Sequence, residues 1–162
     1  MHCKKILVAF DGSENSYRAV NYVSEIARDL DGAEVMLLHV EMLPDRDMYP
    51  EEEAWKRVCK EREEHSRARL DEGAAILMGK GLPEDAVSTE YIPSCHSPFH
   101  NRDQCSMGAG VAVDILAMQE RDGFGTVVVG RKGVSKQEEF LFGSVSSKIM
   151  RRAQGCTVWV VN

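Results

Sequence analysis

The stretch Thr126-Val127-Val128-Val129-Gly130-Arg131-Lys132-Gly133, followed after nine further residues by Gly143-Ser144, decides the fold of this chain. A run of valines that ends at a glycine is typical of a strand covered on both faces. Glycines at 130 and 133 allow a sharp turn and the close approach of a ligand. The Gly143-Ser144 pair predicts the start of a helix, where free backbone N–H groups can bind phosphate.

The rest of the chain alternates strand patterns with helix patterns. We expect strands at 5–10, 34–40, 86–92, 126–129 and 156–161, and helices at 14–30, 51–78, 111–121 and 144–152. Alternation of this kind predicts the α/β class, with a single open parallel five-stranded sheet and helices on both faces. We expect the strand order 3-2-1-4-5. We expect one domain, residues 1–162, with an irregular loop insert at about 93–108.

Three of the expected helices show an apolar face that should pack on the sheet. Helix 14–30 should begin at the N-cap Ser13. The positions expected to face inward are Ala19, Val20, Val23, Ile26, Ala27 and Leu30 in the first helix, Trp55, Cys59, Ser66, Leu70, Ala74 and Leu77 in the second, and Ala112, Ile115, Leu116 and Gln119 in the third.

Composition excludes several classes of protein. The net charge of −6 argues against a general nucleic-acid or membrane-surface binder. No apolar run approaches the roughly 20 residues that span a bilayer. The N-terminus enters a strand directly after Lys4-Lys5, without a signal-peptide pattern, so we expect a cytoplasmic protein. The five cysteines are an odd number in such a chain, and we interpret them as reduced thiols rather than a disulfide framework.

The candidate site lies where the strands end. In open α/β sheets, ligands bind beyond the carboxyl ends of the strands, and Asp11, Val40 and Gly130 all occupy such positions. The Asp11 carboxylate can accept hydrogen bonds from ribose hydroxyls, or it can stabilise the Gly12-Ser13 turn. Lys132 can pair with phosphate groups or can be solvated.

The spacing Gly130-x2-Gly133-x9-Gly143-Ser144 resembles the ATP-binding motif G-2x-G-9x-G-[S/T] of the universal stress protein family. Residues 6–13, Ile-Leu-Val-Ala-Phe-Asp-Gly-Ser, and residues 37–40, Leu-Leu-His-Val, are similar to the family's first two strands. The resemblance covers most of the chain except roughly 93–108.

This resemblance implies that the chain binds ATP with Mg or Mn. It implies that adenine lies against the first two strands, in contact with the backbone near Val40. Phe10 departs from the smaller residue expected there, so its ring would stack on the base or crowd it. The residues implied for nucleotide binding are Ala9, Phe10, Asp11, Val40, Val129, Gly130, Lys132, Gly133, Gly143, Ser144, Val145 and Ser146.

The resemblance implies regulation more than turnover: a nucleotide-loaded switch or binding module of the stress response, with slow or no hydrolysis. No catalytic residue is evident in the sequence, and the G-x-x-x-x-G-K-[ST] signature of P-loop proteins is absent. Two alternatives stay open. One is a metal-dependent hydrolase of ATP or another nucleotide, and the other is a redox- or zinc-sensing dimeric module.

The insert and the last strand carry two further expectations. Cys95, His96, His100 and Cys105 are residue types that bind zinc, but their spacing favours a polar surface loop with two ordinary thiols. We expect the insert to be mobile without a ligand and dispensable for the fold. Strand 156–161 is apolar on both faces and lies at a sheet edge, which predicts a homodimer. The other cysteines, Cys3, Cys59 and Cys156, should be in the core.

Overall fold

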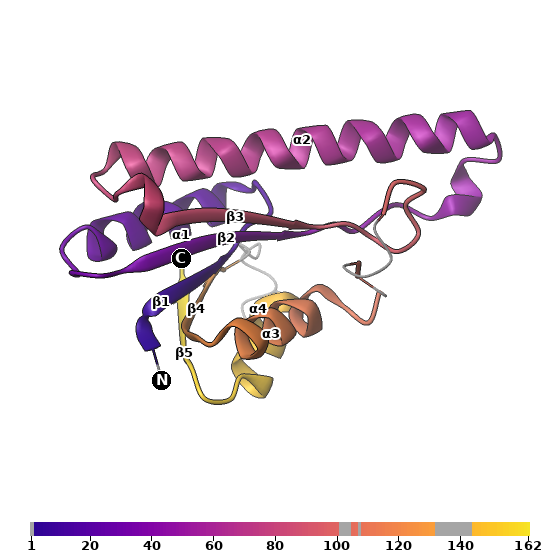
Figure 1. Cartoon of the computed structure of the whole chain (residues 1–162). Coiled ribbons are helices and arrows are strands. Elements are labelled where there is room, and N and C mark those ends of the chain that lie inside the picture. The colour runs from indigo at the N-terminus through magenta and orange to yellow at the C-terminus, as the bar shows by residue number, and fades with distance from the viewer. Residues whose placement is uncertain (1, 101–104, 107, 132–143) are drawn as a thin grey trace.

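The computed structural model describes residues 2–100, 105–106, 108–131 and 144–162, and every structural statement below concerns these residues. They form one sheet of five parallel strands in the order β3-β2-β1-β4-β5 (Figure 1). Both the order and the parallel pairing confirm the predicted fold class. The strands are β1 (His2–Ala9), β2 (Glu34–Val40), β3 (Val87–Ile92), β4 (Phe124–Gly130) and β5 (Thr157–Val161).

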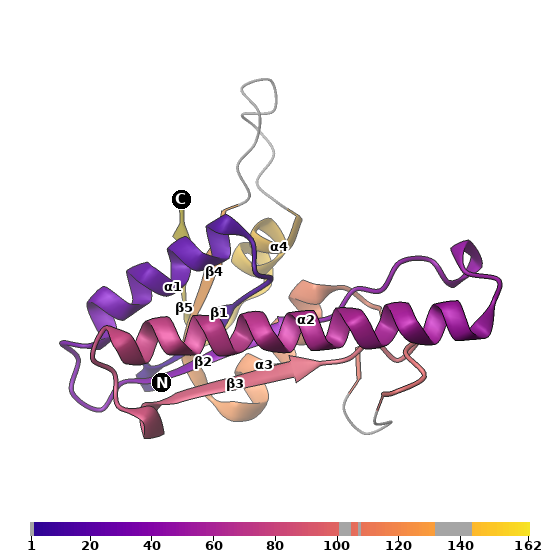
Figure 2. The ribbon, with the colours of Figure 1, turned by 90° about the horizontal axis from the view of Figure 1, so that it is seen from above.

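The helices of the described chain cover both faces of the sheet. They are α1 (Glu14–Ala27), α2 (Glu52–Gly79), α3 (Val111–Asp122) and α4 (Ser144–Arg152), with short 3-10 turns at η1 (Arg46–Met48) and η2 (Glu84–Ala86). Helices α1 and α2 lie on one face, and α3 and α4 lie on the other (Figure 1, Figure 2). The chain moves outward from β1 to β3 and then crosses back to β4, so right-handed connections place the two pairs on opposite faces.

Helix α1 begins where the sequence predicts, because Ser13 caps its N-terminus. The backbone of Ser13 is extended, and its Oγ accepts a hydrogen bond from the N–H of Ser16 at 3.3 Å. The helix ends at Ala27, before the predicted Leu30. The Leu30 N–H donates to the Ala27 carbonyl at 3.1 Å in a turn, which leads the chain towards β2.

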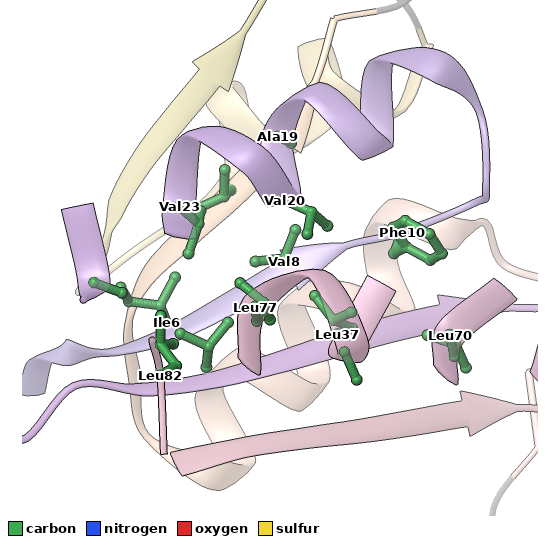
Figure 3. Close-up of a cluster of buried hydrophobic side chains, with 14 of the residues drawn as sticks. Ile6, Val8, Phe10, Ala19, Val20, Val23, Leu37, Leu70, Leu77 and Leu82 are labelled. Carbon is green, nitrogen blue, oxygen red and sulfur yellow. The ribbon is translucent and has the colours of Figure 1, made fainter. Parts of the chain in front are cut away.

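Each face of the sheet has its own buried cluster. Ile6 and Val8 of β1 pack beneath α1 and α2 (Figure 3), while Leu7 packs beneath α3 and α4. Successive strand residues point to opposite faces, so β1 contributes to both clusters in turn. Strand β4 is buried from Phe124 to Val129, as expected for a strand covered on both sides.

Strands β1 and β4 both begin earlier than predicted, since His2 pairs with Phe124. Gly125 makes this close pairing possible. A Cβ at Gly125 would lie 2.4 Å from the carbonyl oxygen of His2, which is a backbone atom that cannot move aside cheaply.

In the first helical segment, the predicted inward positions Ile26 and Leu30 are only partly buried. Helices α2 and α3 also bury a slightly different set of side chains from the one that their patterns predict. In α2, Ser66 is only partly buried, whereas Gly73 is buried and lets the helix approach β2 closely. In α3, Met118 is buried and Leu116 only partly, because α3 packs against α4 as well as the sheet. The other positions predicted for these helices are buried: Trp55, Cys59, Leu70, Ala74, Leu77, Ala112, Ile115 and Gln119. None of the described helices is both long and apolar enough to cross a bilayer.

Candidate nucleotide site and its surroundings

The carboxyl ends of the parallel strands lie at one edge of the sheet. Ala9, which ends β1, is in register with Val129 of β4. Gly130 ends β4, and Asp11 lies two residues after the end of β1, so both lie at this edge. Val40 ends β2 on the other side of β1. The fold therefore brings together strand ends that are far apart in the sequence.

The turn after β1 is built around Asp11. Its Oδ1 accepts the N–H of Ser13 at 2.9 Å, and Gly12 adopts the left-handed conformation at φ +72°. Burial acts to raise the pKa of Asp11, but hydrogen bonds from Ser13 and Ser16 outweigh it, so the pKa lies below its ordinary value. Asp11 is thus ionised at neutral pH. It stabilises the turn, and as an exposed carboxylate it keeps further acceptor sites.

Gly130 ends β4 against the first turn of α1. A Cβ at this position would lie 2.5 Å from the carbonyl oxygen of Asn15 and 3.0 Å from the backbone nitrogen of Ser16. Gly130 does not have a positive φ, so the glycine is required by the approach of the helix and not by a left-handed turn. The end of β4 and the N-terminus of α1 therefore pack backbone to backbone.

Ala9, Val40 and Val129 belong to the cluster beneath α3 and α4. Phe10 lies on the opposite face, where its side chain points into the space between α1 and α2 (Figure 3). The Phe10 residue is 3% exposed, and its ring meets the Tyr17 ring edge-on at a centroid distance of 5.1 Å. Because the ring is held in the core, only the Phe10 backbone faces the sheet edge.

The connection from β4 to α4 is described in part. Helix α4 begins at Ser144, Val145 is partly buried and Ser146 is buried. Since α4 follows β4, its N-terminus lies at the same sheet edge as Asp11. Lys132, Gly133 and Gly143, the remaining predicted site residues, lie outside the described residues.

Next to this edge lies a buried polar group that the sequence did not reveal. We call it the Glu41 cluster; its members are His39, Glu41, Arg62, Ser66 and Tyr91. Glu41 follows β2 directly, and its side chain is only 2% exposed. Its Oε1 accepts from Arg62 Nε at 3.0 Å, and its Oε2 accepts from Ser66 Oγ at 3.1 Å and from Tyr91 Oη at 3.4 Å.

The cluster holds Glu41 as a carboxylate. Burial acts to raise the pKa of Glu41, yet the neighbouring His39, the hydrogen bond from Arg62 and the Arg62 charge bring it below its ordinary value. Burial and the negative charge of Glu41 raise the pKa of Tyr91, so its hydroxyl stays protonated and can donate. Arg67 lies over the Tyr91 ring at 4.6 Å and adds a second cation from α2.

His39 connects the Glu41 cluster to β1. Its Nδ1 lies 3.0 Å from the carbonyl oxygen of Phe10, and because a carbonyl can only accept, the geometry assigns the proton to Nδ1. Its Nε2 is buried, lies 3.5 Å from Glu41 Oε2 and has no hydrogen-bond partner among the described residues. His39 also stacks on Tyr91, with parallel rings 5.7 Å apart. His39 therefore joins the carboxyl ends of β1, β2 and β3.

A weak signal for this cluster is visible in hindsight. A glutamate directly follows the apolar strand β2, and Arg62 and Ser66 are spaced i,i+4 on one face of α2. The spacing alone does not say that this face of α2 covers the end of β2. Only the packing of α2 on the sheet brings the three residues together.

The insert is anchored at both of its ends. Ser94 and Ser106 form an isolated parallel bridge and are both buried. The Ser106 N–H donates to the Pro93 carbonyl at 2.8 Å, and Ser106 Oγ donates to Oδ2 of Asp114 in α3 at 2.6 Å. Ser97 is also buried, and it lies close to the Cys59 thiol of α2. The described part of the insert is therefore packed against both α2 and α3.

The prediction that the cysteines are all reduced is wrong, because Cys95 and Cys105 form a disulfide. Two sulfurs bonded to each other cannot act as thiolate ligands, which removes them from the zinc hypothesis. No group of three or more potential metal-binding side chains occurs in the part of the chain that the structure describes. Cys59 is buried as predicted and Cys156 is partly buried, but Cys3 is exposed, so the core prediction for Cys3 is wrong.

A hollow of about 700 Å³ lies at the opposite end of the sheet, around the amino ends of β1 and β2. It is lined in part by Lys4 and Lys5, whose amines donate to the carbonyl oxygens of Asp31 and Asp122. Both lysine amines are already hydrogen-bonded to backbone carbonyls, and the hollow lies at the other end of the sheet from the N-termini of α1 and α4. We therefore do not consider the hollow a better candidate for the ligand site than the carboxyl ends of the strands.

Comparison with known proteins agrees with this fold. The chain is 25% identical over 158 residues to a universal stress protein of Methanocaldococcus jannaschii, covering 98% of this chain and 81% of that protein. Its fold is similar to that of a universal stress protein in complex with cAMP, with a TM-score of 0.65, 21% identity, and coverage of 98% and 96% of the two chains. It is also similar to a universal stress protein from Archaeoglobus fulgidus in complex with dAMP, with a TM-score of 0.60, 20% identity, and coverage of 98% and 97%.

The sequence pattern of one family matches nearly the whole chain. It covers residues 2–95 and 106–162 and leaves out only the first residue and the interior of the insert, between Cys95 and Ser106. The match includes every strand and helix of the sheet described above. The chain therefore belongs to the universal stress protein family.

Proposed function

We propose that this chain binds ATP, with Mg²⁺ or Mn²⁺, at the carboxyl edge of the sheet between Asp11 and Gly130. The observation that carries the proposal is the packing of Gly130 against Asn15, which fixes the N-terminus of α1 beside the end of β4. Helix α4 begins at the same edge, and helix N-termini attract anions through their free N–H groups and dipoles. The cAMP and dAMP complexes of the two structural relatives support an adenine nucleotide as the ligand.

The residues at this edge suit the parts of ATP. Val40 offers its backbone to the adenine, and the exposed Asp11 carboxylate accepts hydrogen bonds from ribose hydroxyls. The backbone from Gly130 to Gly133 and from Gly143 to Ser146 binds the phosphates, with Lys132 as an added cation. The metal ion, when bound with ATP, neutralises phosphate charge.

The role that we propose is a nucleotide-loaded regulatory module of the stress response in the cytoplasm, with slow or no hydrolysis. Asp11, one of the titratable side chains near this edge among the described residues, accepts a hydrogen bond from its own turn. The use of the Asp11 carboxylate in the turn favours nucleotide binding over nucleotide hydrolysis. A metal-dependent hydrolase is the second candidate, and it would use the same exposed carboxylate to orient water.

Calorimetry with ATP and Mg²⁺ tests the site. Gly143→Val should abolish binding, because a branched side chain would block the backbone from the phosphates. Asp11→Ala should weaken binding about tenfold, the loss expected for a hydrogen bond to a charged group. Gly79→Val is a matched control at the end of α2, where nothing lies within 4 Å of an added Cβ. Equal affinities for Gly143→Val and the wild type would show that the site is elsewhere.

Timed release of phosphate separates the two candidates. A binding module should hold ATP through many minutes with less than one phosphate released per chain. Sustained release that needs Mg²⁺ or Mn²⁺ and is lost in Asp11→Ala would establish the hydrolase instead.

A further inference from the structure

The Cys95–Cys105 disulfide stands at the base of the segment that the family pattern leaves out. The family match stops at residue 95 and resumes at 106, so the two cysteines enclose the part of the insert that the match leaves out. On one side β3 ends at Ile92, and on the other α3 begins at Val111. The disulfide therefore joins the two points at which the insert leaves and rejoins the family fold.

The base of the insert is also closed without the disulfide. The Cys95 N–H donates to the Ser106 carbonyl at 3.0 Å, and the Ser106 N–H donates to the Pro93 carbonyl at 2.8 Å. The Ser106 hydroxyl is bonded to Asp114 of α3. These contacts keep the Cα atoms of Cys95 and Cys105 near their separation of 5.0 Å, so two thiols at these positions would remain close enough to form the bond again.

Cys95 and Cys105 are more accessible to solvent than Cys59, the free cysteine that lies nearby on α2. Cys95 and Cys105 are both partly exposed, which allows a thiolate from solution to approach them. Cys59 is buried beneath Ser97, and burial raises the pKa of its thiol, which keeps it protonated and a poor nucleophile. Cys59 therefore does not compete in thiol exchange.

The disulfide is close to the Glu41 cluster through the end of β3. The Glu41 N–H donates to the Ile92 carbonyl at 2.9 Å, three residues before Cys95, and Tyr91 of the same strand donates to the Glu41 carboxylate. Ser97, two residues after Cys95, packs against Cys59 in the face of α2 that also carries Arg62. Cys95 therefore lies close to the residues of β3 and α2 that pack around Glu41.

We propose that Cys95 and Cys105 form a redox site whose substrate is a dithiol. One thiolate of the dithiol attacks a sulfur of the disulfide, forms a mixed disulfide, and expels the other cysteine as a thiolate, which takes up a proton. The second thiol of the dithiol then loses its proton and attacks the sulfur that the dithiol contributes to the mixed disulfide. This step closes a disulfide within the former dithiol and expels the second cysteine as a thiolate, which is protonated in turn. In total the dithiol loses two electrons and two protons, and the chain gains two thiols.

The consequence of reduction is local. We expect the sheet and its helices to keep their structure, while the end of β3 and Ser97 lose a covalent restraint. We expect the amides of Ser97 and Glu41 to exchange with deuterium several-fold faster in the reduced chain, while amides in β4 keep their rates. The inference does not depend on nucleotide binding, and its readouts are independent of ATP.

The test titrates the intact folded chain with mixtures of reduced and oxidised dithiothreitol. Samples are quenched in acid, denatured and alkylated, and thiols are counted by mass. The expected result is three alkylated thiols under oxidising conditions and five under reducing conditions. The change should occur in a single transition with one midpoint potential, should be fully reversible on reoxidation, and should leave the circular dichroism spectrum unchanged. The double variant Cys95→Ser/Cys105→Ser should show three thiols throughout, and Cys156→Ser should keep the transition with two and four.

Four outcomes would overturn the proposal. Five thiols in every mixture would mean that the disulfide does not form. Three thiols in every mixture would mean that it is inert in the folded chain. A transition that coincides with loss of the circular dichroism signal would show a bond needed by the fold. Equal exchange of Ser97 and Glu41 amides in both redox states would show that reduction has no effect on the sheet edge.

Discussion

The backbone of Gly130 rests directly on the backbone of Asn15, and a Cβ at Gly130 would lie 2.5 Å from the Asn15 carbonyl oxygen. This contact joins the two halves of the candidate site, the turn after β1 and the connection after β4. It also explains why a glycine suits the end of β4, even though its backbone is not left-handed. The same atoms thus serve the packing of the fold and the shape of the site.

We expect Gly130→Ala to destabilise the chain by about 1–3 kcal/mol, the usual cost of forcing extra atoms into a packed region. The added methyl group must push α1 away from β4, since the atoms it meets belong to the backbone. Urea unfolding measures the change. Gly79→Ala is the control, because an added Cβ there meets nothing within 4 Å. Similar unfolding free energies for both variants would contradict the contact.

Glu41→Gln should lower the free energy of unfolding by about 1–3 kcal/mol at pH 7, because the amide is uncharged and has only one acceptor oxygen for the two donors Arg62 and Ser66. The folded pKa of Glu41 is below its ordinary value, so its contribution is present above about pH 4.5 and is lost as the pH falls through the folded pKa. The difference between the variant and the wild type should therefore shrink in acid.

The matched control for this effect is Glu53→Gln. Glu53 pairs with Lys56 on α2, but its side chain is 85% exposed, and exposed pairs contribute little. Unfolding curves from pH 3 to 7 compare the two variants. A Glu41→Gln difference that is the same at pH 3 and pH 7 would rule out a buried carboxylate as its cause.

Replacing residues 96–104 by a two-residue Gly-Ser link should leave the sheet intact. The Cα atoms of Cys95 and Cys105 are 5.0 Å apart, and two linking residues span that distance because each adds up to about 3.5 Å. The loss of Ser97 should free the Cys59 thiol, which then reacts with iodoacetamide in the folded chain. A shortened chain that does not fold would show that the interior of the insert belongs to the core.

We expect the wild-type chain to form a homodimer at micromolar concentration through β5, the strand at the sheet edge. The side chains from Val158 to Val161 are only partly buried, and Trp159 meets Tyr22 edge-on at 5.9 Å. Lysines at Thr157 and Asn162, two exposed positions, should convert the dimer into a monomer in light scattering. Glu84→Lys, near the opposite edge, should leave it unchanged. A wild-type monomer would refute the prediction.

Much of the fold could be predicted from local patterns. Strand β2 and helix α4 have the predicted bounds, and Ser13 caps α1 as its residue type suggests. These features depend on hydrophobic periodicity and on hydrogen bonds between near neighbours, which a sequence displays directly. The alternation of strands and helices then leaves few arrangements other than the observed strand order.

The convergence of the strand ends could be predicted from the sequence, but the orientation of their side chains could not. Parallel strands place their carboxyl ends at one edge, so Asp11 and Gly130 were expected to lie close together. The resemblance places the Phe10 ring near the adenine, yet the ring lies in the core between α1 and α2. The buried Gly73 of α2 has no side chain and so leaves space for the ring. Which face receives a strand-end side chain depends on the helices above it, and the strand pattern does not contain that information.

The sequence by itself determined the alternating elements, the strand order and the edge of the sheet that carries the candidate site. Tertiary structure alone decided the burial of Glu41 with its partners from α2 and β3, the reason for glycine at 130, and the pairing of Cys95 with Cys105. The physical reason is the range of the interactions. Periodicity and capping act within a few residues, whereas these contacts join segments that meet only when the helices pack on the sheet.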